Sequence, residues 1–289
     1  MLVIGEKING TRKLVNKAVV ERDADHIRRL AISQVEAGAD VLDINAGTMP
    51  DREPDDMVWL INTVQEAVDK PLCLDSANPA ALLAGIAATK QTPMINSISM
   101  EEHRIRETLP LVARYGCRVL ALALDGTSIP ATCEGRMAVG RRLFEETRKA
   151  GVPDDNMYVD PLVMTVGTDS EACCITLATA RAILAEFPKA HLTGGLSNVS
   201  FGLPARTLLN RAFMTLAIEA GMDSAIVDPT DRGLMETIYA TYAVLGIDAY
   251  CGKYSRAFRA GKIGPKLEDR KTDKNKPANA ATAPVPAIS

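Results

Sequence analysis

The chain has 289 residues, 47% of them hydrophobic, and a formal net charge of −3. This length suits one large domain, and the nearly balanced charge gives no electrostatic reason to expect nucleic acid or an anionic membrane as a partner. No apolar run reaches the roughly 18 to 20 residues that span a bilayer, and the opening MLVIGEKING lacks the basic segment of a signal peptide. We therefore expect a soluble, cytoplasmic protein that binds neither nucleic acid nor membrane.

One pattern repeats along the chain: a short apolar strand, a polar tip and an amphipathic helix. The apolar runs predict strands at 2–10, 40–47, 71–78, 93–99, 117–126, 156–163, 191–200 and 222–229. Helical periodicity predicts helices at 23–39, 53–70, 79–90, 100–116, 134–151, 169–187, 203–221 and 230–246. The chain thus contains about eight strand–helix units, the number found in a closed barrel.

Strands that are almost continuously apolar are typical of a parallel sheet buried on both faces, and regular alternation with helices favours parallel connections. Suitable left-handed C′ glycines and N-cap residues stand at the expected helix ends: Gly38, Gly116, Gly151 and Gly221, and Asp23, Ser76 or Asn78, and Thr230. An open doubly wound sheet is the alternative, but no G-x-G-x-x-G turn follows the first strand. We predict an α/β fold, a (β/α)8 TIM barrel over residues 1–265. Residues 266–289 are predicted to be a disordered tail, with a basic docking arm as the alternative.

In such a barrel the functional side chains lie at the carboxyl ends of the strands. These ends carry carboxylates, carboxamides and hydroxyls: Glu6 and Asn9, Asp43 and Asn45, Asp75, Asn96 and Ser97, Asp125, Asp160, Ser197 and Asn198, and Asp228. Lys7 is the only lysine at a strand end, and alternation along the strand points it away from the face of Glu6. Schiff-base catalysis and nucleophilic catalysis by serine or cysteine are therefore excluded, because the lysine or base that they need is not placed there.

The six cysteines and three histidines do not form a metal-binding pattern. The chain has no C-x-x-C and no cysteine with a histidine at zinc-ligand spacing, so we expect reduced structural thiols and no directly bound metal. Carboxylates alone could hold Mg²⁺, but Asn96 and Asn198 are poor substitutes for charge.

Aspartate and asparagine together suit a flat, neutral heterocycle. One carboxylate can accept the parallel ring N–H and amino groups of a 2-amino-4-oxo-pyrimidine, and an amide can serve a neighbouring ring nitrogen and carbonyl. The alternative for single residues is structural: Asp43 and Asp75 could cap the following helices, and Asn45 could shape a turn.

Six stretches in chain order carry a family resemblance: GEKING, LDINAG, CLDSAN, MINSIS, YVDPL and GLSNVSFGLPARTLLNRAF. Together they resemble the pterin-binding family, and most of all its methyltetrahydrofolate:corrinoid protein methyltransferases and the related folate domain of cobalamin-dependent methionine synthase. The resemblance implies a TIM barrel of the dihydropteroate synthase type. It also implies an enzyme that transfers a methyl group, in either direction, between N5 of 5-methyltetrahydrofolate and the cobalt of a corrinoid (cobalamin) carried by a partner protein.

The resemblance implies roles for individual residues. Asp160 matches the carboxylate that binds the ring N–H and 2-amino group of the pterin, and Asp75 and Asn96 match the pair that holds the rest of its polar edge. Asn198 matches the amide near N5, and Arg206 matches an arginine at the pterin site. The expected catalytic residues are thus Asn198 and Asp160, and the expected pterin-binding residues are Asp75, Asn96, Asp160, Ser197, Asn198 and Arg206.

The resemblance also implies how such a site works. An amide anion at N5 would be a very poor leaving group, so transfer needs a proton or hydrogen bond at N5 and a strong nucleophile, which Co(I) supplies. A neutral Asn198 that hydrogen-bonds N5 or a water beside it fits this need, and the rest of catalysis is positioning. Glu6 and Asn9 match the first family motif either as ligand contacts or as braces of the barrel.

Three alternatives stay open. Dihydropteroate synthase would want basic residues at the seventh and eighth strands, whereas a zinc-dependent thiol methyltransferase would want His and Cys at strand ends. A non-catalytic folate-binding protein would keep the site without exchanging methyl groups with a corrinoid. We further expect the corrinoid protein to dock on the rim loops 47–54 and 126–135. From the family we expect a homodimer, for which the helix at 60–68 offers a face.

Overall fold

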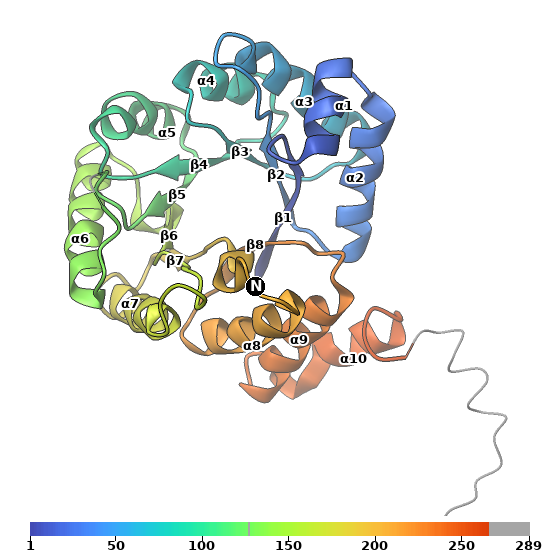
Figure 1. Cartoon of the computed structure of the whole chain (residues 1–289), viewed down its shortest axis with the longest axis vertical. Helices are drawn as coiled ribbons and strands as arrows, with labels where there is room; N and C mark the ends of the chain where they lie inside the picture. The colour runs from blue at the N-terminus through green and yellow to red at the C-terminus, as the bar shows by residue number, and fades with distance from the viewer. Residues whose placement is uncertain (127, 266–289) are drawn as a thin grey trace, which may run out of the picture.

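Eight parallel strands form a barrel in the computed structural model, which describes residues 1–126 and 128–265. The strands are β1 (Leu2–Asn9), β2 (Val41–Asn45), β3 (Leu72–Asp75), β4 (Met94–Ile98), β5 (Arg118–Leu122), β6 (Met157–Asp160), β7 (His191–Leu192) and β8 (Ser224–Val227). They pair in the order β7-β6-β5-β4-β3-β2-β1-β8. Figure 1 looks along the barrel and shows the helices as an outer ring around the strands. The predicted (β/α)8 barrel is confirmed.

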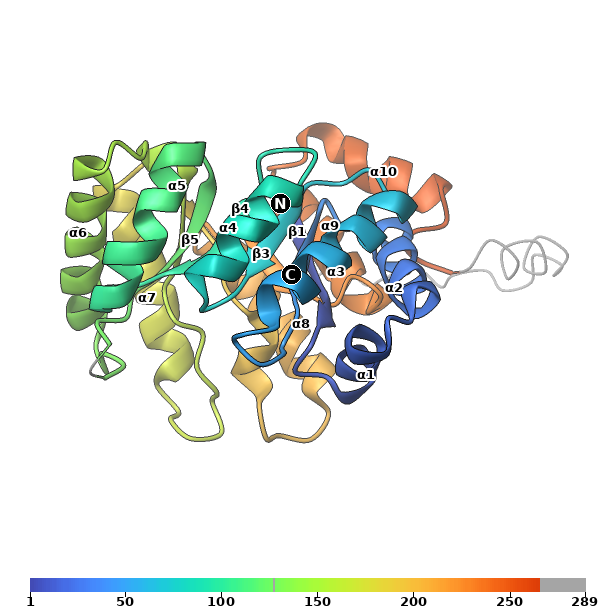
Figure 2. The same ribbon diagram turned by 90° about the horizontal axis from the view of Figure 1, so that it is seen from above.

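The helices of the described residues are α1 (Lys13–Glu21), α2 (Ala24–Ala37), α3 (Glu53–Ala67), α4 (Pro79–Ala88), α5 (Leu109–Tyr115), α6 (Cys133–Lys149), α7 (Ala172–Glu186), α8 (Arg206–Glu219), α9 (Arg232–Val244) and α10 (Gly252–Arg259). Helices α1 and α10 were not predicted; α10 packs against α9 at the edge of the barrel (Figure 2). The predicted helix at 100–116 is divided: a π-helical turn, η1 (Arg104–Thr108), precedes α5. Pro110 lies in the first turn of α5, directly after this π-helical turn.

Most predicted helix ends are confirmed. All four glycines have positive φ: Gly38, Gly116, Gly151 and Gly221. Asp23 caps α2 by accepting from His26 N, and Asn78 caps α4 by accepting from Ala80 N. The prediction at Thr230 is wrong by one residue, because Asp231 accepts from Leu234 N and caps α9.

The seventh strand departs most from the prediction. We predicted strand over 191–200, but the strand pairs with β6 in register only at His191 and Leu192, and residues 196–200 form a 3-10 turn, η3 (Leu196–Ser200). Gly194 and Gly195 make the transition, since Ile226 N donates to Gly194 O at 3.0 Å and Gly195 bridges Ile226. These contacts close the barrel between β7 and β8. A Cβ on Gly194 would lie 2.9 Å from Val163 Cγ2, so a larger residue there would have to displace Val163.

The barrel interior has an apolar floor beneath a polar layer. The floor is formed by Ile4, Val41, Cys73, Met94, Leu120 and Tyr158. Because alternate residues of a strand share a face, the residues two positions further along point into the same interior. On five of these six strands that residue is polar: Glu6, Asp43, Asp75, Asn96 and Asp160. The larger apolar cluster fills the space between the strands and the helices.

Three further predictions concerned the surroundings of the barrel. Leu60, Ile61 and Val64 of α3 are buried against the barrel itself, so they offer no face to a second copy. No helix within residues 1–126 and 128–265 is long and apolar enough to cross a bilayer. The predicted tail, 266–289, lies outside the described residues.

The ends of β1 and β2 depend on a close backbone approach at Gly10. A Cβ on this residue would lie 1.9 Å from Ala46 O, so Gly10→Ala must force the two strand ends apart. We expect this variant to lose about 3 kcal/mol of unfolding free energy in urea denaturation. Gly140→Ala is the matched control, because its Cβ would meet nothing within 4 Å and α6 would gain about 0.5–1 kcal/mol. Equal stabilities of the two variants would contradict the close approach.

Candidate active site

Four predicted residues meet at the ends of β2, β3 and β4. Asp75 pairs in register with Asn96 across β3 and β4. Asn45 Nδ2 donates to Asp75 Oδ2 at 3.0 Å, and Asn96 Nδ2 donates to Asp43 Oδ1 at 3.3 Å. Residues of β2 thus brace Asp75 on β3 and Asn96 on β4, and the capping and turn roles considered for Asp43, Asp75 and Asn45 are not what these side chains do.

Burial sets the electrostatics of this cluster. Asp43 is 3% exposed and has the apolar floor beneath it. Desolvation, with repulsion from Asp75, raises the pKa of Asp43 to about 8. Burial also raises the pKa of Asp75, but the hydrogen bond from Asn45 and the charge of Arg104 oppose the rise. Asp75 is therefore the member of the pair that ionises more readily.

Asp160 stands alone on the other side of the barrel mouth. The residue is 9% exposed, and burial raises its pKa to about 6 against the opposing effect of backbone N–H groups. Leu162 N donates to Asp160 Oδ1 at 2.7 Å. The loop is held by the buried Arg136, whose Nη1 donates to Pro161 O and Leu162 O at 2.7 and 2.8 Å. At neutral pH Asp160 is an ionised acceptor fixed by backbone donors.

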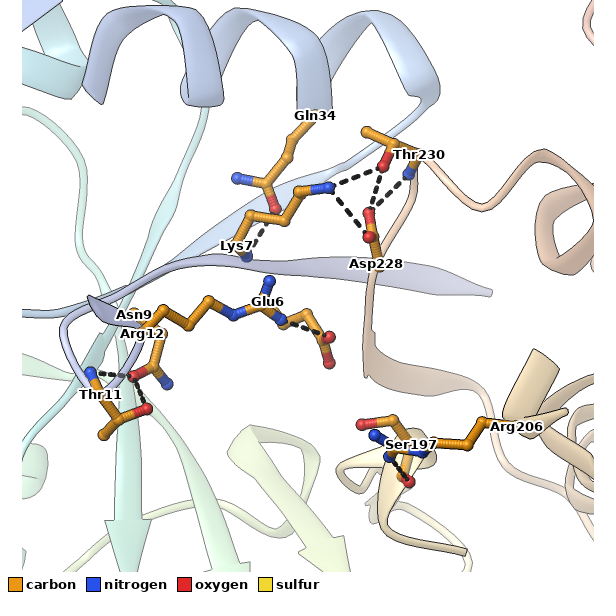
Figure 3. A network of polar contacts seen from close by, with 10 residues as sticks. All are labelled: Glu6, Lys7, Asn9, Thr11, Arg12, Gln34, Ser197, Arg206, Asp228 and Thr230. Atoms are coloured by element: carbon orange, nitrogen blue, oxygen red, sulfur yellow. Dashed lines mark hydrogen bonds and ion pairs between the residues drawn. The ribbon is translucent and has the colours of Figure 1, made fainter. Parts of the chain in front are cut away.

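Asn198 and Ser197 lie on the turn η3 and not on a strand. The side chain of Asn198 is exposed, and its Nδ2 would lie 3.1 Å from a Cβ built on Gly195. Arg206 begins α8 and holds this turn: its Nη2 donates to Ser197 O at 2.6 Å, and its Nε donates to Ser200 Oγ at 3.0 Å. Figure 3 shows the contact between Arg206 and Ser197. The turn therefore presents an exposed amide on a backbone that Arg206 holds.

Charged pairs line the mouth at β1 and β8 (Figure 3). Glu6 points into the barrel, where burial raises its pKa while Arg12 opposes the rise through an Nη2–Oε1 contact of 2.9 Å. Lys7 points to the opposite side of β1, as alternation predicted, and its Nζ lies 3.0 Å from Asp228 Oδ2. This pairing keeps Lys7 away from the interior.

Of the remaining predicted strand-end residues, two accept hydrogen bonds from the loop residues that follow them and one lies within a strand. Asn9 Oδ1 accepts from Thr11 N at 2.9 Å, and Asp125 Oδ1 accepts from Ser128 N at 3.4 Å. Ser97 is buried on β4. Asn9 therefore braces the turn after β1. Within residues 1–126 and 128–265, no group of three or more His, Cys, Asp or Glu side chains could hold a metal ion.

The structure adds residues around the candidate site that the sequence analysis did not name. Arg136 and Arg104 act from helices, where Arg104 Nη1 donates to Ser76 O at 2.9 Å behind the site. Leu162 supplies a backbone N–H and has a positive φ of 66°. An arginine on the inward-facing side of a predicted helix can be recognised in the sequence. A backbone N–H donor cannot, because every residue except proline has one.

Comparison with known proteins identifies the family to which the chain belongs. The pattern of the family described as pterin binding enzyme matches residues 5–228. A methylcorrinoid:tetrahydrofolate methyltransferase from Eubacterium limosum is 43% identical over 267 residues, which are 92% of this chain and 98% of that protein. A methionine synthase from Mycobacterium tuberculosis is 32% identical over 240 residues, 78% of this chain but only 20% of that longer protein.

Solved structures show the same fold. A dihydropteroate synthase from Xanthomonas albilineans with 4-aminobenzoic acid superposes with a TM-score of 0.66 at 22% identity, over 86% of this chain and 92% of that one. One from Coxiella burnetii in complex with pteroic acid gives 0.63 at 18% identity, over 84% and 93%. The strand-end motifs and the matched sequence agree with the predicted family: the chain belongs to the pterin-binding enzymes.

Proposed function

We propose that the protein is a methyltransferase that moves a methyl group between N5 of 5-methyltetrahydrofolate and the cobalt of a corrinoid carried by a partner protein. The observation that carries the proposal is the 43% identity to a methylcorrinoid:tetrahydrofolate methyltransferase along 98% of its length. The 32% identity to a methionine synthase supports the same exchange. The name of the first relative puts the methyl group on the corrinoid at the start, which favours tetrahydrofolate as acceptor.

In this proposal the polar layer above the apolar floor holds the pterin. Ionised Asp160 accepts the ring N–H and 2-amino group, and Asp75 and Asn96 accept and donate along the remaining polar edge. The support is geometric, because Asp75 and Asn96 are register partners and Asp160 is fixed by Leu162 N. Buried acceptors reject a ligand that lacks the matching donors, since their hydrogen bonds would then be lost.

The turn η3 faces the reacting nitrogen in this proposal. Asn198 hydrogen-bonds N5, or a water beside it, as charge changes there, and this contact strengthens in the transition state. Ser197 lies beside it, and Arg206 fixes the turn and lies at the substrate's tail. The protein supplies no nucleophile of its own, because the cobalt brought by the partner is the methyl donor or acceptor.

The partner must reach the barrel mouth. We propose that the corrinoid protein docks over the rim loops at 47–54 and 126–135, of which residue 127 lies outside the described part. A homodimer and a cytoplasmic location stay predictions from the family and the composition.

The first experiment is an anaerobic absorbance assay with reduced cob(I)alamin and 5-methyltetrahydrofolate, run also in reverse with methylcobalamin and tetrahydrofolate. We expect Asn198→Ala to slow loss of the Co(I) band by about 100-fold, because the hydrogen bond at N5 is lost. Substrate affinity measured by calorimetry should stay within about threefold of the wild type, since the contact matters mainly in the transition state.

Asn62→Ala on the exposed face of α3 is the matched control and should react at the wild-type rate. Equal rates for both variants would remove Asn198 from the mechanism. Pterin binding without any methyl exchange, even with added corrinoid protein, would favour a folate-binding role, and absence of binding would refute the pterin site.

The ionisation of Asp160 predicts a pH dependence of binding. Because its pKa is about 6, affinity for 5-methyltetrahydrofolate should fall by about tenfold per pH unit below that value as the acceptor becomes protonated. Stability should change in the opposite sense. A raised native-state pKa stabilises the protonated protein, and this contribution is lost as the pH rises through about 6.

Calorimetry between about pH 5 and about pH 8 tests this dependence. Asp160→Asn should bind at least tenfold more weakly at the upper end and show little slope. Asp154→Asn, at a surface pair with Arg148, is the control and should keep the wild-type slope. A slope that survives in Asp160→Asn would assign the titration to another group.

A further inference from the structure

A buried carboxyl group lies directly beneath the proposed pterin site, and the mechanism above does not use it. Asp43 points inward from β2, two residues after Val41 of the apolar floor. It is 3% exposed, whereas Asp75 and Asn96 above it are half-buried. Asp43 is therefore too deeply buried to contact a ligand directly, but it is close enough to affect a bound ligand through Asp75 and Asn96.

The neighbours of Asp43 include no cation. Asn96 Nδ2 donates to Asp43 Oδ1 at 3.3 Å, and the Cys73 thiol also hydrogen-bonds to this carboxyl group. The charged groups that face it are Asp75 on β3 and Glu6 on β1, both acidic. Among the described residues no lysine, arginine or histidine forms an ion pair with Asp43, so ionisation would leave a buried charge uncompensated.

Asp75 is better placed to carry the negative charge of the pair. It accepts from Asn45 Nδ2 at 3.0 Å, it is more exposed, and the charge of Arg104 acts on it. Ionising two adjacent carboxyl groups above an apolar floor costs much free energy. The group whose charge is less compensated therefore keeps its proton. The pKa of about 8 for Asp43 agrees with this assignment.

We propose, on the basis of the methyl-transfer function above, that Asp43 is a positioning residue: a neutral carboxylic acid that fixes the amide of Asn96 from below and leaves Asp75 ionised. By accepting one N–H of Asn96 it turns the carbonyl oxygen and the second N–H of that amide toward the substrate. The pterin then meets one negative charge on this side of the mouth instead of two. Strand β2 also holds Asp75, through the hydrogen bond that Asn45 donates to it.

Three variants test the role of Asp43. Asp43→Leu removes the acceptor for Asn96, so we expect affinity for 5-methyltetrahydrofolate to fall about tenfold in calorimetry. Asp43→Asn keeps a carbonyl acceptor and a neutral side chain, and should restore most of that loss. Asp40→Asn, at the opposite end of the barrel where Asp40 accepts from Val3 N, is the matched control. The wild-type affinity should also decline above about pH 8, and Asp43→Asn should abolish this decline.

A pterin-free measurement tests the protonation separately. A raised native-state pKa contributes stability below the unfolded-state value, and this contribution is lost as pH rises through about 8. Urea denaturation should show that loss in the wild type, and a flatter profile in Asp43→Asn.

Each outcome has one meaning. If Asp43→Asn binds as weakly as Asp43→Leu and leaves the pH profile of stability unchanged, Asp43 acts as a carboxylate and the proposal is wrong. Wild-type affinity in a folded Asp43→Leu would also overturn it. A wild-type protein that binds no pterin would refute both the methyl-transfer function and the positioning role of Asp43. Pterin binding without methyl exchange would count against the methyl-transfer function alone, and the three variants would still test the role of Asp43.

Discussion

The constraint on which the structure depends is the desolvation of carboxyl groups above an apolar barrel floor. Alternation along the strands places acids and amides two residues after apolar side chains, so five polar residues face one poorly hydrated interior. Charged groups in such a place need compensation, or they keep their protons. Here the compensation comes from amides and backbone N–H groups, which suit a neutral, flat ligand better than a metal ion.

The mouth of the barrel is divided into two regions of different chemistry. The side formed by β2, β3 and β4 is acidic and amide-rich, and its hydrogen bonds run between strands. The side formed by β1, β8 and the turn η3 contains ion pairs and two arginines, Arg12 and Arg206. The first region suits the donor-rich edge of a pterin, and the second suits the anionic tail of a folate.

The proposed chemistry explains why no base or nucleophile stands in the site. When the partner's cobalt gives or takes the methyl group, the protein has only to hold the ring and stabilise the charge that changes at N5. A rotatable amide on a fixed turn meets that need. The backbone of η3 is anchored by Arg206, while the side chain of Asn198 remains exposed and adaptable.

The sequence by itself determined the barrel, because strand and helix periodicity are local and the parallel connection follows from their alternation. It also determined which residues stand at the strand ends. Tertiary structure decided what the acids and amides of the central strands do: Asn45 holds Asp75, and Asp43 lies buried beneath Asn96. It also replaced the end of the predicted seventh strand with the turn η3. These outcomes depend on contacts between strands far apart in the chain and on desolvation, and neither is encoded in the periodicity of a single segment.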